Sequence, residues 1–282
     1  MSLSIITNVQ SLKVQQNLTA ATNKLNTAIE RMTTGYKINS AKDDAAGYSI
    51  ASQMDAKLSS YDVAANNAQI GLDMLTTTEE NYSLITDHLQ RIRDLTEQAA
   101  NGTYSDDSRA AIEAEIKSRL DEIDRISGSA EYNGMLLMDG STGAVNIQVG
   151  IDGTTNSRIA LEANLFSDAK AATIINQGDN ATFAAACAAG STAAAQLTHI
   201  DAAINNISTR VTTLGASQNR LESAIDSIQV TTENLTSSLS TVKDADIATE
   251  STRYLQAQIL QSAATTLLST ANQTPSIALQ LI

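Results

Sequence analysis

The chain has 282 residues, of which 42% are hydrophobic but only 3% aromatic, so it can bury a large surface without the rings that fill a thick core. Its formal net charge of −13 argues against nucleic acid and anionic lipid as partners, because both require a basic surface. The single cysteine, Cys187, excludes an intramolecular disulfide and a metal site made of several thiolates. We therefore expect an elongated protein whose helices pack through small and unbranched side chains.

The N-terminal segment, residues 1–29, carries only two charged side chains, Lys13 and Lys24. It lacks the continuous apolar stretch and small-residue cleavage site of a secretory signal, so we expect no Sec-type signal peptide. From residue 18 onward, apolar residues recur at spacings of seven, four, three and four, which predicts an amphipathic helix. These residues are Leu18, Leu25, Ile29, Met32 and Tyr36.

Two further helices are predicted on either side of a short polar segment, residues 101–109. Gly102 and a run of turn-forming residues in this segment indicate a reversal of the chain, so the two helices should form an antiparallel pair. Their periodic apolar positions are Leu75, Tyr82, Ile85, Leu89 and Ile92 before the reversal, and Ile112, Ile116, Leu120 and Ile123 after it.

The middle of the chain changes from helical to alternating periodicity. Val145, Ile147 and Val149 alternate before the turn-forming residues 151–153, and Ile159 and Leu161 alternate after them. This pattern predicts a β-hairpin over about residues 144–162. Residues 166–195 are rich in Ala and have no clear apolar row, so we expect a short variable tip there, with the cysteine accessible to solvent.

A heptad repeat over residues 197–242 predicts one long helix in a coiled coil or helical bundle. One row consists of Ile200, Ile207, Leu214, Leu221, Ile228, Leu235 and Val242, and the companion row of Leu197, Ile204, Val211, Gln218, Ile225, Thr232 and Leu239. The expected fold class is therefore mainly α, an elongated bundle formed by the N- and C-terminal segments with a small β-hairpin region in the middle.

The last 28 residues, 255–282, contain no charged side chain, although they are rich in Leu and Ile. Exposed apolar surface without charges is unusual for an isolated protein, so both ends are predicted to be buried against other protein. The predicted assembly seam consists of Leu18, Leu25, Ile29, Met32, Ile259, Leu260, Leu267 and Leu268.

The sequence contains little that supports an enzymatic function. The two histidines, His88 and His199, lie in helical stretches, and Cys187 has no recognisable base near it in the sequence. Nucleotide-binding, zinc-protease, EF-hand and CxxC motifs do not occur. We expect no catalytic residues, no cofactor and no metal.

Several segments closely resemble the bacterial flagellins. They include LNTAIERMTTGYKINSAKDDAAGYSIA at residues 25–51, TLGASQNRLESAIDSI at residues 213–228 and AQILQSAATTLLSTANQTP at residues 257–275. The resemblance covers roughly residues 1–165 and 195–282. It implies a non-enzymatic subunit of the extracellular flagellar filament, of a minimal type that has only the core domains.

The resemblance also implies a domain arrangement and a set of partners. An inner-core domain would combine residues 1–43 with 244–282, and an outer-core domain would take residues 44–243, including the hairpin and the tip. The expected partners are further copies of the chain, an export chaperone at the C-terminal helix, filament cap and junction proteins, and the host Toll-like receptor for flagellin. Export would occur in an unfolded state through the flagellar type III apparatus.

Four residues, Gln90, Arg91, Leu95 and Glu115, match the receptor-recognition patch of the family. The alternative reading makes them ordinary helix-surface and seam residues. Two other functions stay open at this point: a junction protein between hook and filament, which shares the terminal helices, and an exported coiled-coil effector or adhesin, which would explain the heptads but not the matching segments.

Overall fold

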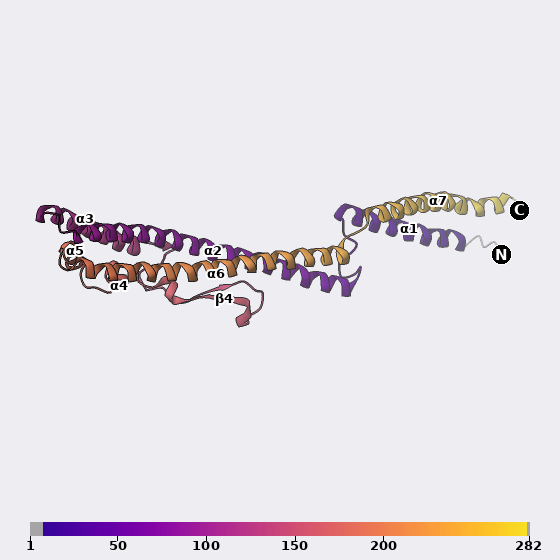
Figure 1. Ribbon diagram of the computed structural model, residues 1–282. Helices are drawn as coiled ribbons and strands as arrows, with labels where there is room; N and C mark the ends of the chain where they lie inside the picture. The colour runs from indigo at the N-terminus through magenta and orange to yellow at the C-terminus, as the bar shows by residue number, and fades with distance from the viewer. Residues whose placement is uncertain (1–7, 281–282) are drawn as a thin grey trace. The chain divides into compact units, whose positions relative to one another are not determined.

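The structure is a computed structural model that describes the backbone of residues 8–280 and the side chains of residues 8–273. Its helices are α1 (Val9–Thr34), α2 (Ala45–Ala100), α3 (Asp106–Ser129), α4 (Ala171–Ile175), α5 (Asn180–Ala188), α6 (Ala193–Lys243) and α7 (Ile247–Gln280), and its short 3-10 helices are η1 (Thr155–Ser157) and η2 (Ala163–Phe166). Its strands are β1 (Glu131–Tyr132), β2 (Met135–Leu136), β3 (Val145–Gln148) and β4 (Arg158–Leu161). The predicted fold class, mainly α with a β-hairpin in the middle, is confirmed (Figure 1).

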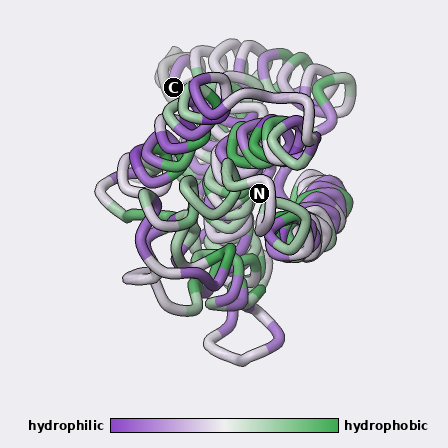
Figure 2. The backbone as a smooth tube through the Cα atoms, turned by 60° about the vertical axis from the view of Figure 1, so that its left-hand side comes forward, coloured by the Kyte–Doolittle hydropathy of each residue, from purple (hydrophilic) through white to green (hydrophobic). Residues whose placement is uncertain are grey.

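The chain forms two compact units. Unit 1 combines Met1–Leu58 with Glu233–Ile282, and unit 2 consists of Ser59–Thr232. The long helices α2 and α6 contribute residues to both units. In Figure 2, hydrophobic and hydrophilic stretches alternate along the helices, as expected for helices that each bury one face.

The core of unit 2 lies between α2, α3 and α6. The heptad row of α6 from Ile200 to Ile228 is buried, and so are the periodic apolar residues predicted for α2 and α3. Between α2 and α3 the chain reverses over a few residues, and Arg91 of α2 meets Glu115 of α3 at 3.2 Å, which confirms the antiparallel pair. The companion row of α6 is only half-buried, because it lies at the edge of the same seam.

The predicted hairpin is formed by β3 and β4, which pair antiparallel with Ile147 opposite Ile159. Gly71 allows the hairpin to lie close to α2, since a Cβ atom at that position would come within 3.1 Å of the Ile147 side chain. A second, shorter antiparallel pair consists of β1 and β2.

The segment after the hairpin is held to the long helices by a buried tyrosine and an arginine. Tyr82 of α2 donates its hydroxyl to the Leu165 carbonyl at 2.9 Å, and Arg210 of α6 donates to the Ser167 carbonyl at 3.0 Å. The same nitrogen of Arg210, Nη1, carries two hydrogens and also donates to the Asp168 carbonyl at 3.3 Å. These bonds supply donors to carbonyls at the end of η2, where the helix has ended and provides no further backbone N–H groups.

The position of Cys187 corrects a prediction. The sequence suggested an accessible cysteine in a loose tip, but Cys187 lies in α5 with no exposed surface and belongs to the main hydrophobic cluster. Helix α5 packs on α3. Asp124 of α3 fixes this arrangement by accepting hydrogen bonds from the Ala171 backbone N–H at 2.8 Å and from the Asn180 side chain at 2.7 Å. Burial raises the pKa of the Cys187 thiol to about 11.

Candidate assembly surface of the terminal helices

In unit 1, α1 and α7 lie side by side and contact each other through small side chains (Figure 1). Among residues 8–273, whose side chains are described, the buried apolar positions of the two helices are Ala21 and Ala28 on α1 and Ala257 and Ala264 on α7, each pair seven residues apart. Alanine permits a close approach of two helices but buries little area, so this pairing supplies a modest part of the stabilisation that long helices require. In the sequence the larger apolar residues obscure these alanines, although their spacing of seven is visible there.

The large apolar side chains of the two helices point outward instead. Those with more than two fifths of their surface exposed are Val9, Leu12, Ile29, Ile247, Leu255, Ile259, Leu260 and Leu267. Ile259 is the most exposed of them, at 68%. Such a row in a nearly chargeless pair of helices is a surface that other protein molecules must cover to remove it from water.

The eight residues of the predicted assembly seam thus fall into two groups. Four of them, Ile29, Ile259, Leu260 and Leu267, are exposed. The other four, Leu18, Leu25, Met32 and Leu268, are half-buried, and their spacing of three or four residues from the buried alanines puts them on the face between α1 and α7.

Uncharged hydrogen bonds join the helices at the terminal end of unit 1. Asn8 caps α1 by accepting the Ser11 N–H at 3.0 Å and donates its amide to the Ala271 carbonyl at 2.8 Å. The Ser11 hydroxyl donates to the Asn272 side chain at 2.7 Å. These bonds fix the register of α1 against α7 without adding charge to the surface.

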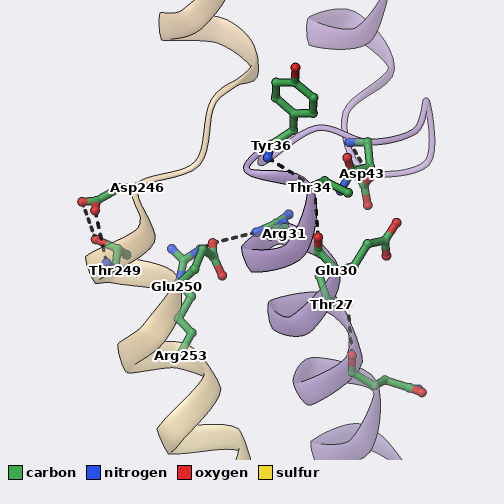
Figure 3. A network of polar contacts seen from close by, with 12 residues as sticks. Thr27, Glu30, Arg31, Thr34, Tyr36, Asp43, Asp246, Thr249, Glu250 and Arg253 are labelled. Atoms are coloured by element: carbon green, nitrogen blue, oxygen red, sulfur yellow. Dashed lines mark hydrogen bonds and ion pairs between the residues drawn. The ribbon is translucent and has the colours of Figure 1, made fainter.

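A charged cluster joins the opposite end of the helix pair (Figure 3). Glu250 of α7 is only 4% exposed, and its Oε1 accepts hydrogen bonds from Arg31 of α1 at 3.3 Å and from Arg253 of α7 at 2.6 Å. Two guanidinium groups therefore compensate one buried carboxylate. Loss of both arginines would leave the buried carboxylate unpaired, which is strongly destabilising.

The two connecting segments beside this cluster pair with each other. The Lys37 N–H donates to the Lys243 carbonyl, and the Ala245 N–H donates to the Gly35 carbonyl, both at 2.8 Å. Gly35 ends α1 with a φ of 75°, a left-handed conformation that favours glycine. The Lys243 ammonium lies 4.7 Å from the centre of the Tyr36 ring. The chain thus enters and leaves the α1–α7 pair through one hydrogen-bonded crossing.

The four residues of the predicted receptor patch lie on α2 and α3 of unit 2, and the structure brings two of them into contact. Arg91 donates its Nε–H to Glu115, and Arg119 donates to the same carboxylate at 2.9 Å. Hydrogen bonds from Arg119 first, and from Arg91, hold the pKa of Glu115 below its ordinary value. Gln90 is exposed beside them, whereas Leu95 is 2% exposed and offers a partner almost no surface.

The part of the chain that the structure describes has neither a metal-binding cluster nor a membrane-spanning helix. Among residues 8–280, no three His, Cys, Asp or Glu side chains are grouped so that they could hold a metal ion. Within the same range, none of the helices combines the length and apolarity needed to span a bilayer.

Long helices that pair through alanine and turn their leucines outward define a structural subunit, one that completes its packing in an assembly. The chain matches the family models of the bacterial flagellin N-terminal helical region over residues 5–142 and of the C-terminal helical region over residues 197–282. It is 33% identical over 285 residues to a flagellin of Listeria monocytogenes, in an alignment that covers 99% of each chain. It is 30% identical over 272 residues to the flagellar filament 30.7 kDa core protein of Treponema maltophilum, with 94% of each chain covered.

One solved structure shows that the fold also occurs in a distant protein. A putative flagellar hook-associated protein from Vibrio parahaemolyticus matches with a TM-score of 0.60 over 72% of this chain and 100% of that chain, at 16% identity. At this identity the likeness concerns the fold alone. On the family matches and the full-length relatives, the chain belongs to the bacterial flagellins and is a structural subunit of the flagellar filament.

Proposed function

We propose that copies of this flagellin polymerise through the outward apolar side chains of α1 and α7, which we call the assembly surface: Val9, Leu12, Ile29, Ile247, Leu255, Ile259, Leu260 and Leu267. The observation that carries the proposal is the exposure of Ile259, Leu260 and Leu267 on a helix that has no charged side chain from residue 255 onward. Burying a leucine or isoleucine contributes about 1.5–3 kcal/mol, so a row of them covered by neighbouring copies provides a large driving force.

The same surface supports a role for an export chaperone. Before polymerisation, α7 would expose its apolar side chains to water, and a chaperone that covers it would prevent premature association. Export in an unfolded state through the flagellar type III apparatus is compatible with an α1–α7 pair that buries mainly alanine, because such a pair is easily opened. Filament cap and junction proteins would meet the same helices at the ends of the filament.

Recognition by the host Toll-like receptor for flagellin is proposed for Gln90, Arg91 and Glu115, which have exposed polar groups on adjoining helices. Leu95 belongs to the predicted patch, and in this role it would support the helix surface from the core. Arg91 supplies donors suited to a carboxylate or carbonyl of a partner. A hook–filament junction role has no observation that favours it over the filament.

Leu267→Lys tests the assembly surface. Leu267 is 58% exposed, so a lysine there disturbs no core of the monomer but adds a charge to each contact that must exclude water. We expect unit 2 to melt at the same temperature as in the unaltered protein while the mass of filament falls at least tenfold. Leu267→Met is the matched control, because it keeps an apolar side chain of similar volume, and it should polymerise normally. Normal filaments from the lysine variant would reject the proposal.

A further inference from the structure

A groove of about 450 Å³ opens between α1 and α7 beside the charged cluster of unit 1. Its charged lining consists of Lys24 and Arg31 on α1 and Glu250 and Arg253 on α7. Three cations therefore face one carboxylate, and that carboxylate is already shared by the two arginines. In a chain with a net charge of −13, this groove is a local cationic site on an otherwise sparsely charged pair of helices.

The cations of the groove have donors left over. Lys24 is exposed, and none of the hydrogen bonds or ion pairs among residues 8–280 uses its ammonium group. The Nε–H of Arg31 is buried and has no acceptor in the described part of the chain. A second carboxylate in the groove would lower its excess from two positive charges to one and would give Lys24 an acceptor.

One carboxylate of α1, that of Glu30, lacks a cationic partner within residues 8–273. Glu30 is the single acidic residue of α1, and its carboxylate has no ion pair among the residues that the structure describes. It extends from α1 on the side away from α7, as Figure 3 shows. Glu30 and Lys24 are six residues apart, which is outside the spacing of three or four at which side chains of one helix meet, so they cannot neutralise each other within a chain.

We propose that the Glu30 carboxylate of one copy binds in the Lys24–Arg31–Arg253 groove of a neighbouring copy. The inference rests on the proposed assembly through α1 and α7 and names a polar contact within it. Donor and groove are different surfaces of the same chain, so the contact is head-to-tail and can repeat without closing, as a filament requires. A charge pair in a mostly apolar interface sets the register between copies, since wrong registers leave both charges unpaired.

A charge exchange tests the contact directly. Lys24→Glu places a second carboxylate beside Glu250 in the groove. Glu30→Lys brings a fourth cation to the three cations of the groove. Each single variant should therefore raise the monomer concentration left at polymerisation equilibrium about tenfold or more. The double variant restores opposite charges and should return to within about threefold of the unaltered protein. Lys57→Glu and Glu233→Lys, at exposed positions outside α1 and α7, are the controls for a change in net charge.

Sedimentation of polymer at low ionic strength provides the measurement, and circular dichroism of the monomers checks that folding is unchanged. Native polymerisation of either single variant, a double variant no better than the singles, or an equal loss in the controls would overturn the pairing. Leu267 does not line the groove, so loss of filaments in Leu267→Lys together with native filaments in Lys24→Glu would reject the pairing while retaining the apolar assembly surface.

Discussion

Gln218 of α6 donates a hydrogen bond from its side-chain amide to the Glu79 carboxylate of α2, with 2.8 Å between Nε2 and Oε2. Gln218 is one of two polar residues in an otherwise aliphatic pair of heptad rows. Both side chains are half-buried, so the bond lies at the edge of the unit 2 core. A polar residue at a seam position favours one register of two long helices over the shifted alternatives, at some cost in stability.

We expect this bond to couple the two residues energetically. Glu79→Ala and Gln218→Ala should each destabilise unit 2, and the double variant should cost less than the sum by about 1.5–3 kcal/mol, the range for a hydrogen bond to a charged group. Urea unfolding followed by circular dichroism gives the four free energies of a double-mutant cycle. Additive losses would mean that the amide and the carboxylate stabilise the helices independently.

The buried thiol of Cys187 should be inert in the folded protein. Its pKa is raised from 9.0 to about 11 because burial disfavours the thiolate, and the thiolate is the reactive form. We expect a maleimide or disulfide reagent to label the thiol only after denaturant unfolds unit 2. Rapid labelling of native monomer would show that α5 opens locally.

The same group makes stability depend on pH. Between pH 9 and about 11 the unfolded chain releases the thiol proton while the folded chain retains it, so the free energy of unfolding falls as pH rises through this window. Cys187→Ala has no such group, so its stability relative to the unaltered protein should rise over that interval. Parallel thermal melts of the two proteins at pH 8 and pH 10.5 give the comparison.

The proposed receptor patch predicts that the Arg91 side chain contributes to receptor activation. Arg91→Ala should weaken receptor activation by monomer, because the guanidinium can donate paired hydrogen bonds that a methyl group cannot, a loss of about 1–3 kcal/mol if the contact excludes water. Glu115 keeps its hydrogen bonds from Arg119, so the fold of the helix pair should be unaffected. Arg125→Ala, which removes an exposed arginine that forms an ion pair with Glu122 of the same helix, is the matched control. Signalling by Arg91→Ala equal to that of the control would remove this arginine from the recognition site.

The terminal helices should gain protection from proteases on assembly. The buried apolar residues among the described side chains of α1 and α7 are alanines, whereas ordering each backbone residue costs about 1–2 kcal/mol, so this pair is marginal in a lone subunit. In the filament, neighbouring copies would cover the exposed leucines and isoleucines of both helices. We expect limited proteolysis to remove α1 and α7 from monomer while sparing unit 2, and to leave all of them intact in filaments. Equal resistance of the helices in both states would argue against coupled folding and assembly.

Sequence periodicity alone determined the long helix α6, the paired parts of α2 and α3, the hairpin and the core of unit 2. Ile200, Ile207 and Leu214 repeat at seven residues, and such a repeat can be buried only along one face of a helix. The family segments at residues 25–51 and 257–275 identified the flagellin. For these features the information is local, because it lies in the spacing of residues on one element.

The tertiary structure alone decided which faces meet. In α1 and α7 the large residues were the visible signal, yet the helices approach through Ala21, Ala28, Ala257 and Ala264, since small side chains permit the closest contact. Cys187 is buried because α5 packs against α3, a partner some 60 residues earlier that no local pattern of the Ala-rich segment reveals. Likewise, Arg31 and Glu250 are far apart in the sequence, and their contact exists only because both connecting segments meet at one crossing beside Gly35.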